Sequence, residues 1–325
     1  MDNVKFIRTV IVLSLLLAVM TAISLFTGSV PLDLSSIPDA GSAENIIFFS
    51  LRLPRVCACL LAGFALALSG FMLQSASSND LASGNIIGIN AGAGFAVLLF
   101  LVFFPDLFHL LPFAAFAGAL MACALVFIIS AFTKSIGSSG SLILSGVAVN
   151  ALFNALISTL SSLFPDVMSS YSSFSVGGFA SVYASSLIVP SFLICAGGIL
   201  CFSLSPVMNI IRLGDEITSS MGYRPFRIRI ILASAAALLA SSAVSFAGLL
   251  GFVGLVIPHL ARFLSGGEAL RSLVISALAG PLLVVLADLL ARTVISPGEL
   301  PAGIFLAIVG VPFFIFLLVR RKKHG

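Results

Sequence analysis

The sequence lacks tryptophan altogether and has only three histidines, and charged residues occupy 9% of its 325 positions. Soluble domains average about 25% charged residues, so this chain has too few charges to cover a water-exposed surface. Hydrophobic residues make up 60% of the chain, and its 28 glycines add to the apolar share. Because a bilayer accepts an apolar exterior, this composition excludes a water-soluble fold and indicates a membrane protein.

Motifs for catalysis and nucleotide binding are missing as well. H-E-x-x-H, G-x-S-x-G and the P-loop G-x-x-x-x-G-K-[ST] do not occur, so we expect no hydrolytic site and no ATP site of the usual kind. The five cysteines fall in apolar runs, where each is expected to pack as a small hydrophobic residue. The sequence therefore predicts a chain that is not an enzyme and holds no cofactor, metal or nucleic acid.

What is abundant is long apolar stretches. A helix needs about 20 mainly apolar residues to cross a bilayer, and the pattern predicts ten such spans. The connections between them are too short for a second domain, so we predict an all-α polytopic membrane protein with one domain over residues 1–325. The predicted spans are 9–28, 55–75, 86–104, 112–132, 141–163, 187–207, 229–247, 249–265, 273–295 and 303–319.

The distribution of lysine and arginine predicts the orientation of these spans. With the N-terminus inside, 13 of the 16 basic residues fall in inner loops and tails, as the positive-inside rule expects. Only Arg52, Arg55 and Arg292 fall on the outer side. One span more or fewer would reverse every later loop, so the asymmetry predicts an even number of crossings with both termini in the cytoplasm.

Polar side chains inside the spans are few. Asp288 precedes Arg292 by four residues, which favours a local ion pair on one helix face. The scarcity of carboxylates argues against a proton- or sodium-coupled carrier and against a charge-selective channel. Four further residues either form interhelical hydrogen bonds or line a substrate path, and both interpretations stay open. They are Asn150, Asn154, Ser241 and Ser245.

The longest inner connection, residues 208–228, contains more than a minimal turn. Gly214 is suited to end one helical segment, and Asp215 and Glu216 suit the first turn of another. Gly222 is suited to end that second helix. The pattern predicts a short helix beneath the bundle that offers a surface to a cytosolic partner; the alternative is an ordinary positive-inside loop.

Several segments, in this order, resemble the permease subunits of ATP-binding-cassette importers for iron chelates (siderophores), haem and cobalamin. The resemblance extends from about residue 50 to 319, although Phe174 stands where that family often has tryptophan and the prolines common after Asn79 are missing. The segments are RLPR (52–55), LALSGFMLQ (66–74), GINAGAG (88–94), LILSGVAVNALFNALIS (142–158), LGDEITSSMG (213–222), GFVGLVIPHLARFLSG (251–266), ADLLAR (287–292), PGELPAGI (297–304) and GVPFFIFLL (310–318).

The resemblance implies the type II ABC importer permease architecture in a bacterial or archaeal cytoplasmic (inner) membrane. It implies two permease subunits, identical or paralogous, above a cytoplasmic ATPase dimer that uses ATP and Mg²⁺, with an extracytoplasmic substrate-binding protein. An iron–siderophore cargo is expected because such cargoes are frequent in the family. Haem and cobalamin are the alternatives within it, and a self-sufficient secondary carrier or channel is the alternative of another class.

The resemblance also implies roles for particular residues. The outer arginines Arg52, Arg55 and Arg292 match positions that dock acidic residues of the binding protein; lipid-headgroup anchoring is the alternative. The 208–228 segment matches the loop that couples the permease to the ATPases. The residues to which this coupling role is assigned are Gly214, Asp215, Glu216, Met221 and Gly222, with Arg224 as a neighbour.

Overall fold

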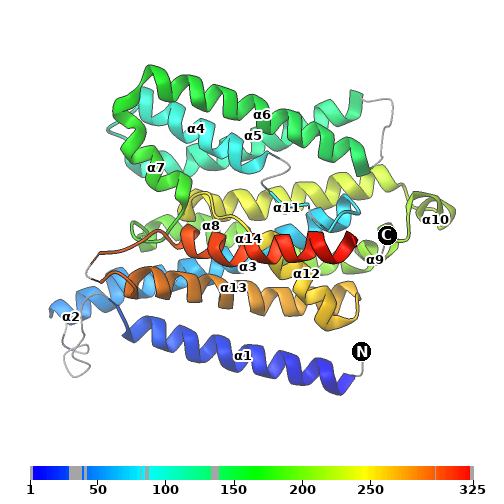
Figure 1. Ribbon diagram of the computed structural model, residues 1–325, viewed down its shortest axis with the longest axis horizontal. Coiled ribbons are helices and arrows are strands. Elements are labelled where there is room, and N and C mark those ends of the chain that lie inside the picture. Colours follow the sequence, from blue (N-terminus) through cyan, green and yellow to red (C-terminus); the bar gives the residue numbers. More distant parts are fainter. Residues whose placement is uncertain are drawn as a thin grey trace.

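The computed structural model describes residues 3–28, 39, 42–80, 82–84, 88–132, 139–296 and 298–322. Within these residues every regular element is a helix, which confirms the all-α prediction. The long helices run roughly parallel to one another and form one bundle (Figure 1). Of the basic residues counted in the sequence, Lys134 and Lys323 lie outside the described part of the chain, as does Pro297 of the PGELPAGI segment.

The helices follow the predicted spans closely. The longer ones are α1 Asn3–Phe26, α3 Leu53–Ala76, α4 Ile89–Phe103, α5 Leu111–Phe132, α6 Ser139–Leu163, α8 Ala184–Ser203, α11 Pro225–Ala247, α12 Val253–Ser265, α13 Ala269–Thr293 and α14 Ala302–Lys322. The shorter ones are α2 Ala43–Ile46, the π-helical turn η1 Ile47–Arg52, η2 Phe108–Leu110, η3 Pro165–Val167, α7 Met168–Val176, α9 Ser205–Ile211 and α10 Asp215–Ser220.

Seven described helical segments are long and apolar enough to cross a membrane, which confirms a multi-span protein. The remaining three predicted spans fall on shorter apolar stretches, in α4, α12 and the Ala302–Ile315 part of α14. Helix α12 has 13 residues, which extend for about 20 Å of the roughly 30 Å of hydrocarbon. It is shorter than predicted because residues 248–252 form a turn, in which Phe252 is left-handed at φ 65°.

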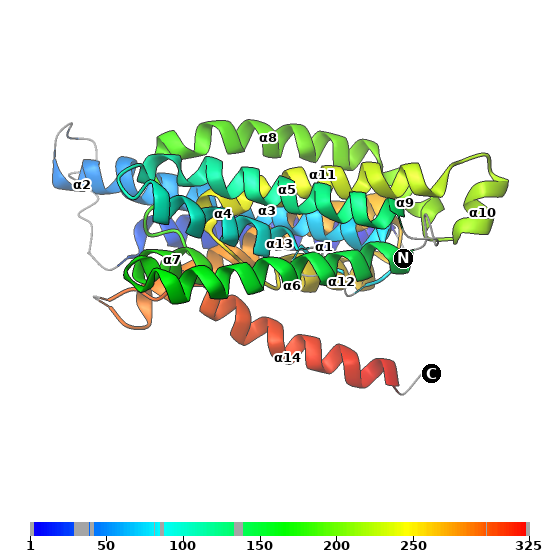
Figure 2. The same ribbon diagram turned by 90° about the horizontal axis from the view of Figure 1, so that it is seen from above.

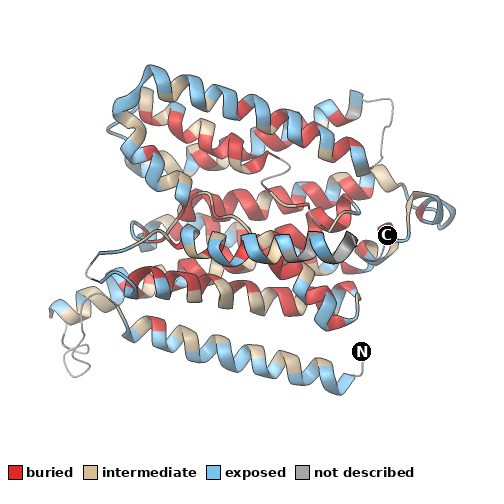
Figure 3. Ribbon diagram, viewed as in Figure 1, coloured by how far each residue is buried: buried red, intermediate tan, exposed pale blue. Residues whose placement is uncertain are grey.

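Helix α3 lies at the centre of the bundle and packs against α11, α12 and α13, and it is mostly buried (Figure 3). Glycines allow these contacts. A Cβ atom on Gly63 would lie 2.5 Å from the carbonyl oxygen of Gly280 on α13, and one on Gly70 would lie 1.9 Å from that of Gly254 on α12. Gly63, Gly70 and Gly254 therefore lie where helix backbones approach each other closely.

The bundle has two distinct ends. One end, called here the α10 end, carries α10 together with the N-terminal end of α1 and the C-terminal end of α14 (Figures 1 and 2). The opposite end, called the α2 end, carries α2 and η1 (Figure 1). The predicted coupling segment and the predicted outer arginines therefore lie at opposite ends.

Candidate coupling and docking sites

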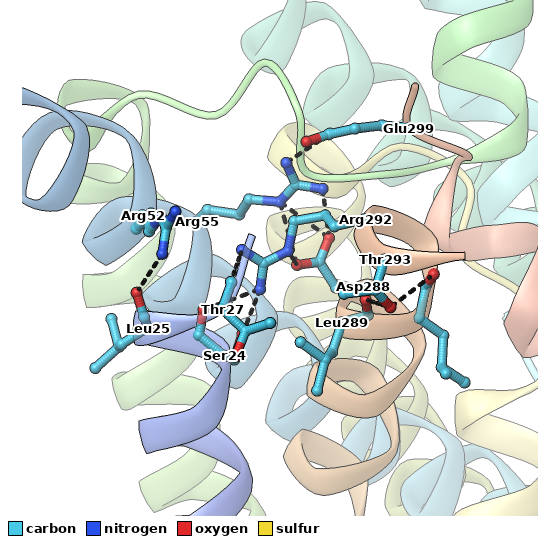
Figure 4. Close-up of polar contacts among 11 residues, drawn as sticks. Ser24, Leu25, Thr27, Arg52, Arg55, Asp288, Leu289, Arg292, Thr293 and Glu299 are labelled. Atoms are coloured by element: carbon cyan, nitrogen blue, oxygen red, sulfur yellow. Dashed lines mark hydrogen bonds and ion pairs between the residues drawn. The ribbon is translucent and has the colours of Figure 1, made fainter. Parts of the chain in front are cut away.

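The charged cluster at the α2 end is built around Asp288 of α13, whose side chain is 0% exposed. Arg55 of α3 donates to its Oδ1 atom from Nε at 3.0 Å and from Nη2 at 2.8 Å. The remaining Nη1 atom of Arg55 donates to Glu299 Oε2 at 2.8 Å (Figure 4). Arg55 thus joins one buried carboxylate and one that is 29% exposed.

Arg292 of α13 lies on the other side of the same carboxylate. Its Nε atom is 3.1 Å from Asp288 Oδ2, which is the ion pair predicted from the i, i+4 spacing. Its Nη1 atom donates to the Thr27 carbonyl at 3.2 Å, and its Nη2 atom to the Ser24 carbonyl at 3.0 Å and hydroxyl at 2.6 Å. Arg292 therefore fastens the C-terminal end of α1 to α13.

Arg52, in η1, reaches the same end of α1. Its Nη1 atom donates to the carbonyls of Leu25 at 3.2 Å and Phe26 at 2.7 Å. Helix C-termini leave carbonyls without intrahelical partners and favour cations, so this contact is a side-chain cap of α1. Arg52 is buried.

The structure thus brings all three predicted docking arginines together, but it gives each of them internal partners. Sequence reasoning found the Arg292–Asp288 pair and missed that Arg55 shares the carboxylate, because Arg55 and Asp288 are 233 residues apart. A usable signal was present, since Asp288 is the only carboxylate in the predicted spans and three arginines were predicted at the same side of the membrane. The docking role stays a prediction.

The predicted short helix in the 208–228 segment is present as α10. Gly214 precedes it at φ 103°, and Gly222 follows it at φ 84°. Both backbone conformations are left-handed, where side chains other than glycine are strained. The Thr218 hydroxyl donates to the Gly214 carbonyl at 2.7 Å and closes the first turn.

Exposed apolar side chains lie on α10 and at its two ends; we call them the α10 face. The spacing of Leu213, Ile217 and Met221 is four residues each time, and all three side chains are exposed, as is Tyr223. Glu216 and Arg224 are exposed beside them. Helix α10 projects beyond the rest of the bundle (Figure 2), so this face is open to a partner. We did not predict Leu213, Ile217 or Tyr223, although the four-residue spacing of the first two with Met221 was visible in the sequence.

Asp215 differs from Glu216 in pointing back to the bundle. Its Oδ1 atom accepts a hydrogen bond from Arg229 Nη2 at 2.7 Å. Arg229 belongs to α11, and its side chain is only 3% exposed. It also donates from Nη1 to the carbonyl of Ala76, the last residue of α3. The sequence pattern did not indicate this contact.

The two predicted asparagines of α6 lie on the surface of this chain. Asn154 is exposed and donates from Nδ2 to the Asn150 carbonyl at 2.8 Å and to its Oδ1 atom at 3.1 Å. Ser158 and Ser162 continue the same exposed line at four-residue spacing. A polar stripe therefore runs along an exposed side of α6.

The two predicted serines of α11 are placed differently. Ser241 and Ser245 are buried inside the bundle and donate to carbonyls of their own helix, those of Leu238 at 3.2 Å and Ser242 at 2.7 Å. These contacts are those of packing residues, and path lining by the two serines stays a prediction. They are buried because the alanine-rich face of α11 packs against α3 and α5.

Comparison with known proteins decides the family. Residues 16–320 match the FecCD transport family. This chain belongs to that family. It is similar to the Fe(3+)-citrate import system permease protein YfmE of Bacillus subtilis (strain 168), with 35% identity over 319 residues that cover 95% of this chain and 94% of the relative. It is also similar to the ferric enterobactin transport system permease protein FepD of Escherichia coli (strain K12), with 37% identity and coverage of 96% and 95%.

A solved structure agrees with this assignment. It is described as an inward-facing conformation of a metal-chelate type ABC transporter, and it superposes with a TM-score of 0.86 at 30% identity, covering 96% of this chain and 99% of that one. The family resemblance predicted from the sequence is therefore confirmed, and this FecCD-family chain is a multi-span transport subunit.

Proposed function

We propose that this chain is the permease subunit of an ATP-driven importer that receives a ferric siderophore from a binding protein and passes it into the cytoplasm by alternating access. The observation that carries this is the match to the FecCD family over residues 16–320, with near-complete coverage of relatives that are ferric-chelate permeases. The proposal includes one domain with ten membrane helices, both termini in the cytoplasm, and a bacterial or archaeal inner membrane.

Uptake into vesicles tests the proposal. Vesicles containing this chain, its ATPase and its binding protein should accumulate radiolabelled iron from ferric citrate, a ferric hydroxamate or ferric enterobactin only when ATP is supplied. Haemin is the competing cargo, since the hemin permease HmuU of Yersinia pestis is 35% identical over 86% of this chain. Uptake without any ATPase would instead establish a self-sufficient carrier.

The α10 face is the proposed contact for a cytoplasmic ATPase dimer, which supplies the ATP and Mg²⁺ chemistry. Support comes from exposed apolar side chains on a projecting helix and at its two ends, Ile217 within α10 and Leu213 and Met221 beside it. Exposed apolar groups of this kind are typical of interaction sites. Because α10 is bounded by Gly214 and Gly222, it is set off from the neighbouring helices.

Charge introduced into this face should weaken the ATPase contact. We expect Ile217→Glu and Met221→Glu to lower ATPase affinity by on the order of tenfold or more, because apolar anchors carry most of the binding energy of an interface. Co-purification and titration binding measure this. Ser219→Glu, on the opposite face of α10, is the matched control and should bind as the native chain does; equal binding by all three variants would exclude this face.

The polar stripe of α6 is the proposed lining of the substrate path, completed by a second permease subunit. Polar side chains facing lipid are unfavourable, so Asn150 and Asn154 are better accommodated beside a water-filled path than against lipid tails. The second subunit, identical or paralogous, then covers the exposed face of α6.

Thiol labelling of substituted cysteines distinguishes side chains that line a water-filled path from side chains that contact lipid. In a background where the exposed Cys57 and Cys195 are replaced by serine, Asn154→Cys should react with a membrane-impermeant thiol reagent in the assembled transporter. Leu152→Cys, two residues away on the exposed opposite side of α6, should stay unreactive. Equal protection of both cysteines would contradict the assignment.

Binding-protein docking is proposed for the α2 end, where Arg55 is the most exposed of the three arginines. Within this chain, Glu299 Oε2 already accepts a hydrogen bond from Arg55 Nη1 at 2.8 Å, so it competes with a carboxylate of the binding protein. Glu299→Gln should therefore free one face of the guanidinium and speed association of an acidic binding protein at low salt, measured by stopped-flow mixing. The gain should fade as ionic strength rises above about 0.1 M. An unchanged association rate at every salt concentration would remove Arg55 from the docking site.

A further inference from the structure

The α10 end contains a buried guanidinium that connects three helices. Arg229 of α11 donates to Asp215 at the start of α10 and to the carbonyl of Ala76 at the end of α3. The Asp215 carboxylate is 43% exposed, whereas the Arg229 side chain is 3% exposed. The contact therefore runs from a surface helix to the interior through a single side chain.

No other side chain in the described residues forms an ion pair between α10 and the bundle. Among the described residues the Thr218 hydroxyl donates to carbonyls, those of Ile210 in α9 and of Gly214, and forms no ion pair. Gly214 and Gly222, with φ of 103° and 84°, end α10 on both sides, so no continuous helix joins it to α9 or α11. The Asp215–Arg229 pair is therefore the principal polar link that holds α10 to the core.

The inner end of this link is α3, the helix at the centre of the bundle. Helices α11, α12 and α13 all pack on α3, so a displacement of the Ala76 end of α3 shifts three interfaces together. Close-packed interiors transmit such displacements because they deform little.

From these observations we propose that Asp215 and Arg229 form a latch that transmits movement of α10 to the C-terminal end of α3. This inference rests on the proposed function, and it gives the two adjacent carboxylates different roles. Asp215 acts inward on the permease, and Glu216 faces the partner. Arg229 is a positioning residue for energy coupling and has no direct contact with the partner or the cargo.

The same end of the bundle offers a matched control. Arg262 of α12 is also buried and also pairs with a half-exposed carboxylate, that of Asp80, at 2.9 Å. Arg262 further bonds to Gln74 and lies over the Phe71 ring of α3. This second pair joins α12 to the C-terminal end of α3 and includes no residue of α10. Asp80→Asn therefore removes a comparable ion pair and leaves the latch intact.

The latch is tested first in the chain alone by electron paramagnetic resonance. Spin labels at Ser220→Cys on α10 and Ser78→Cys after α3, with Cys57 and Cys195 replaced by serine, report the distance between the two elements. We expect one narrow distance distribution in the native background and in Asp80→Asn, and a broadened one in Asp215→Asn and Arg229→Gln. Unchanged distributions in both latch variants would overturn the proposal.

The second test measures coupling in vesicles with the ATPase and the binding protein. Using ferric citrate, a ferric hydroxamate and ferric enterobactin, we expect Asp215→Asn to lower iron imported per ATP hydrolysed by on the order of tenfold, with ATPase co-purification unchanged. Asp215→Glu should restore the ratio. The double variant should be no worse than either single variant, since both changes break one contact.

The outcomes separate this inference from the proposed function. If the native chain imports none of these probes with ATP, the proposed function fails while the spin-label result still decides whether the latch exists. If the native chain imports iron and Asp215→Asn loses ATPase binding at an unchanged ratio in the complexes that do assemble, Asp215 is a docking residue and the latch is wrong.

Discussion

Replacing Asp288 by alanine is expected to remove most of the folded protein from the membrane. Two guanidinium groups, those of Arg55 and Arg292, are within 3.1 Å of this fully buried carboxylate. Removing one partner of a buried pair leaves uncompensated charge and costs about 3–5 kcal/mol. Native domains are stable by only about 5–15 kcal/mol, so this loss is a large share of the total.

Thermal unfolding in detergent and the yield of monodisperse protein measure the effect. The matched control is Glu299→Gln, which removes the other carboxylate bound to Arg55 but at a site that is 29% exposed. Exposed pairs contribute about 0.2–1 kcal/mol, so this variant should remain close to the native chain. Similar thermal stability of Asp288→Ala and Glu299→Gln would show that the buried cluster is not what holds α1, α3 and α13 together.

Adding a single methyl group at Gly70 is expected to be nearly as damaging. Its Cβ atom would lie 1.9 Å from the carbonyl oxygen and 2.4 Å from the Cα atom of Gly254. Both are backbone atoms, which cannot turn away as a side chain can. Overpacking costs about 1–3 kcal/mol where side chains adjust, and we expect Gly70→Ala to reach or exceed the upper value because α3 and α12 must separate.

Gly140→Ala is the control for this change. Gly140 is also in a helix, but a Cβ atom there meets nothing within 4 Å. Alanine is more favourable than glycine by roughly 0.5–1 kcal/mol in a helix interior, and Gly140 is the second residue of α6, so this variant should be as stable as the native chain or gain less than that. Both variants are compared by the same unfolding measurement. A Gly70→Ala chain with native stability would contradict the close α3–α12 contact.

Hydropathy predicted the helices well and their lengths less well. The predicted span 55–75 and helix α3 differ by one or two residues at each end. The predicted span 249–265 was too long, because an apolar run does not reveal that the helix is interrupted at residues 248–252. A turn made of glycine, leucine and phenylalanine has no polar signal, and only the packing of Gly248 against the Phe174 carbonyl in the bundle exposes it.

Among the site residues, too, some features were predictable from the sequence and others were not. The short helix α10 was predictable, since glycine and acidic residues act on their immediate neighbours. Whether Ser241 faces a path or the core was not predictable, because that depends on which side of α11 the other helices cover. The inward direction of Asp215 was likewise hidden, since its partner Arg229 is 14 residues further along and on another helix.

By itself, the sequence determined that this chain forms a helical membrane bundle and that its 208–228 segment forms a short helix, because apolar length and glycine conformation are local properties of the chain. Only the tertiary structure decided which charges are available to partners. Burial and pairing depend on residues that are distant in sequence, and the arginines at both ends of the bundle are bound by groups from other helices.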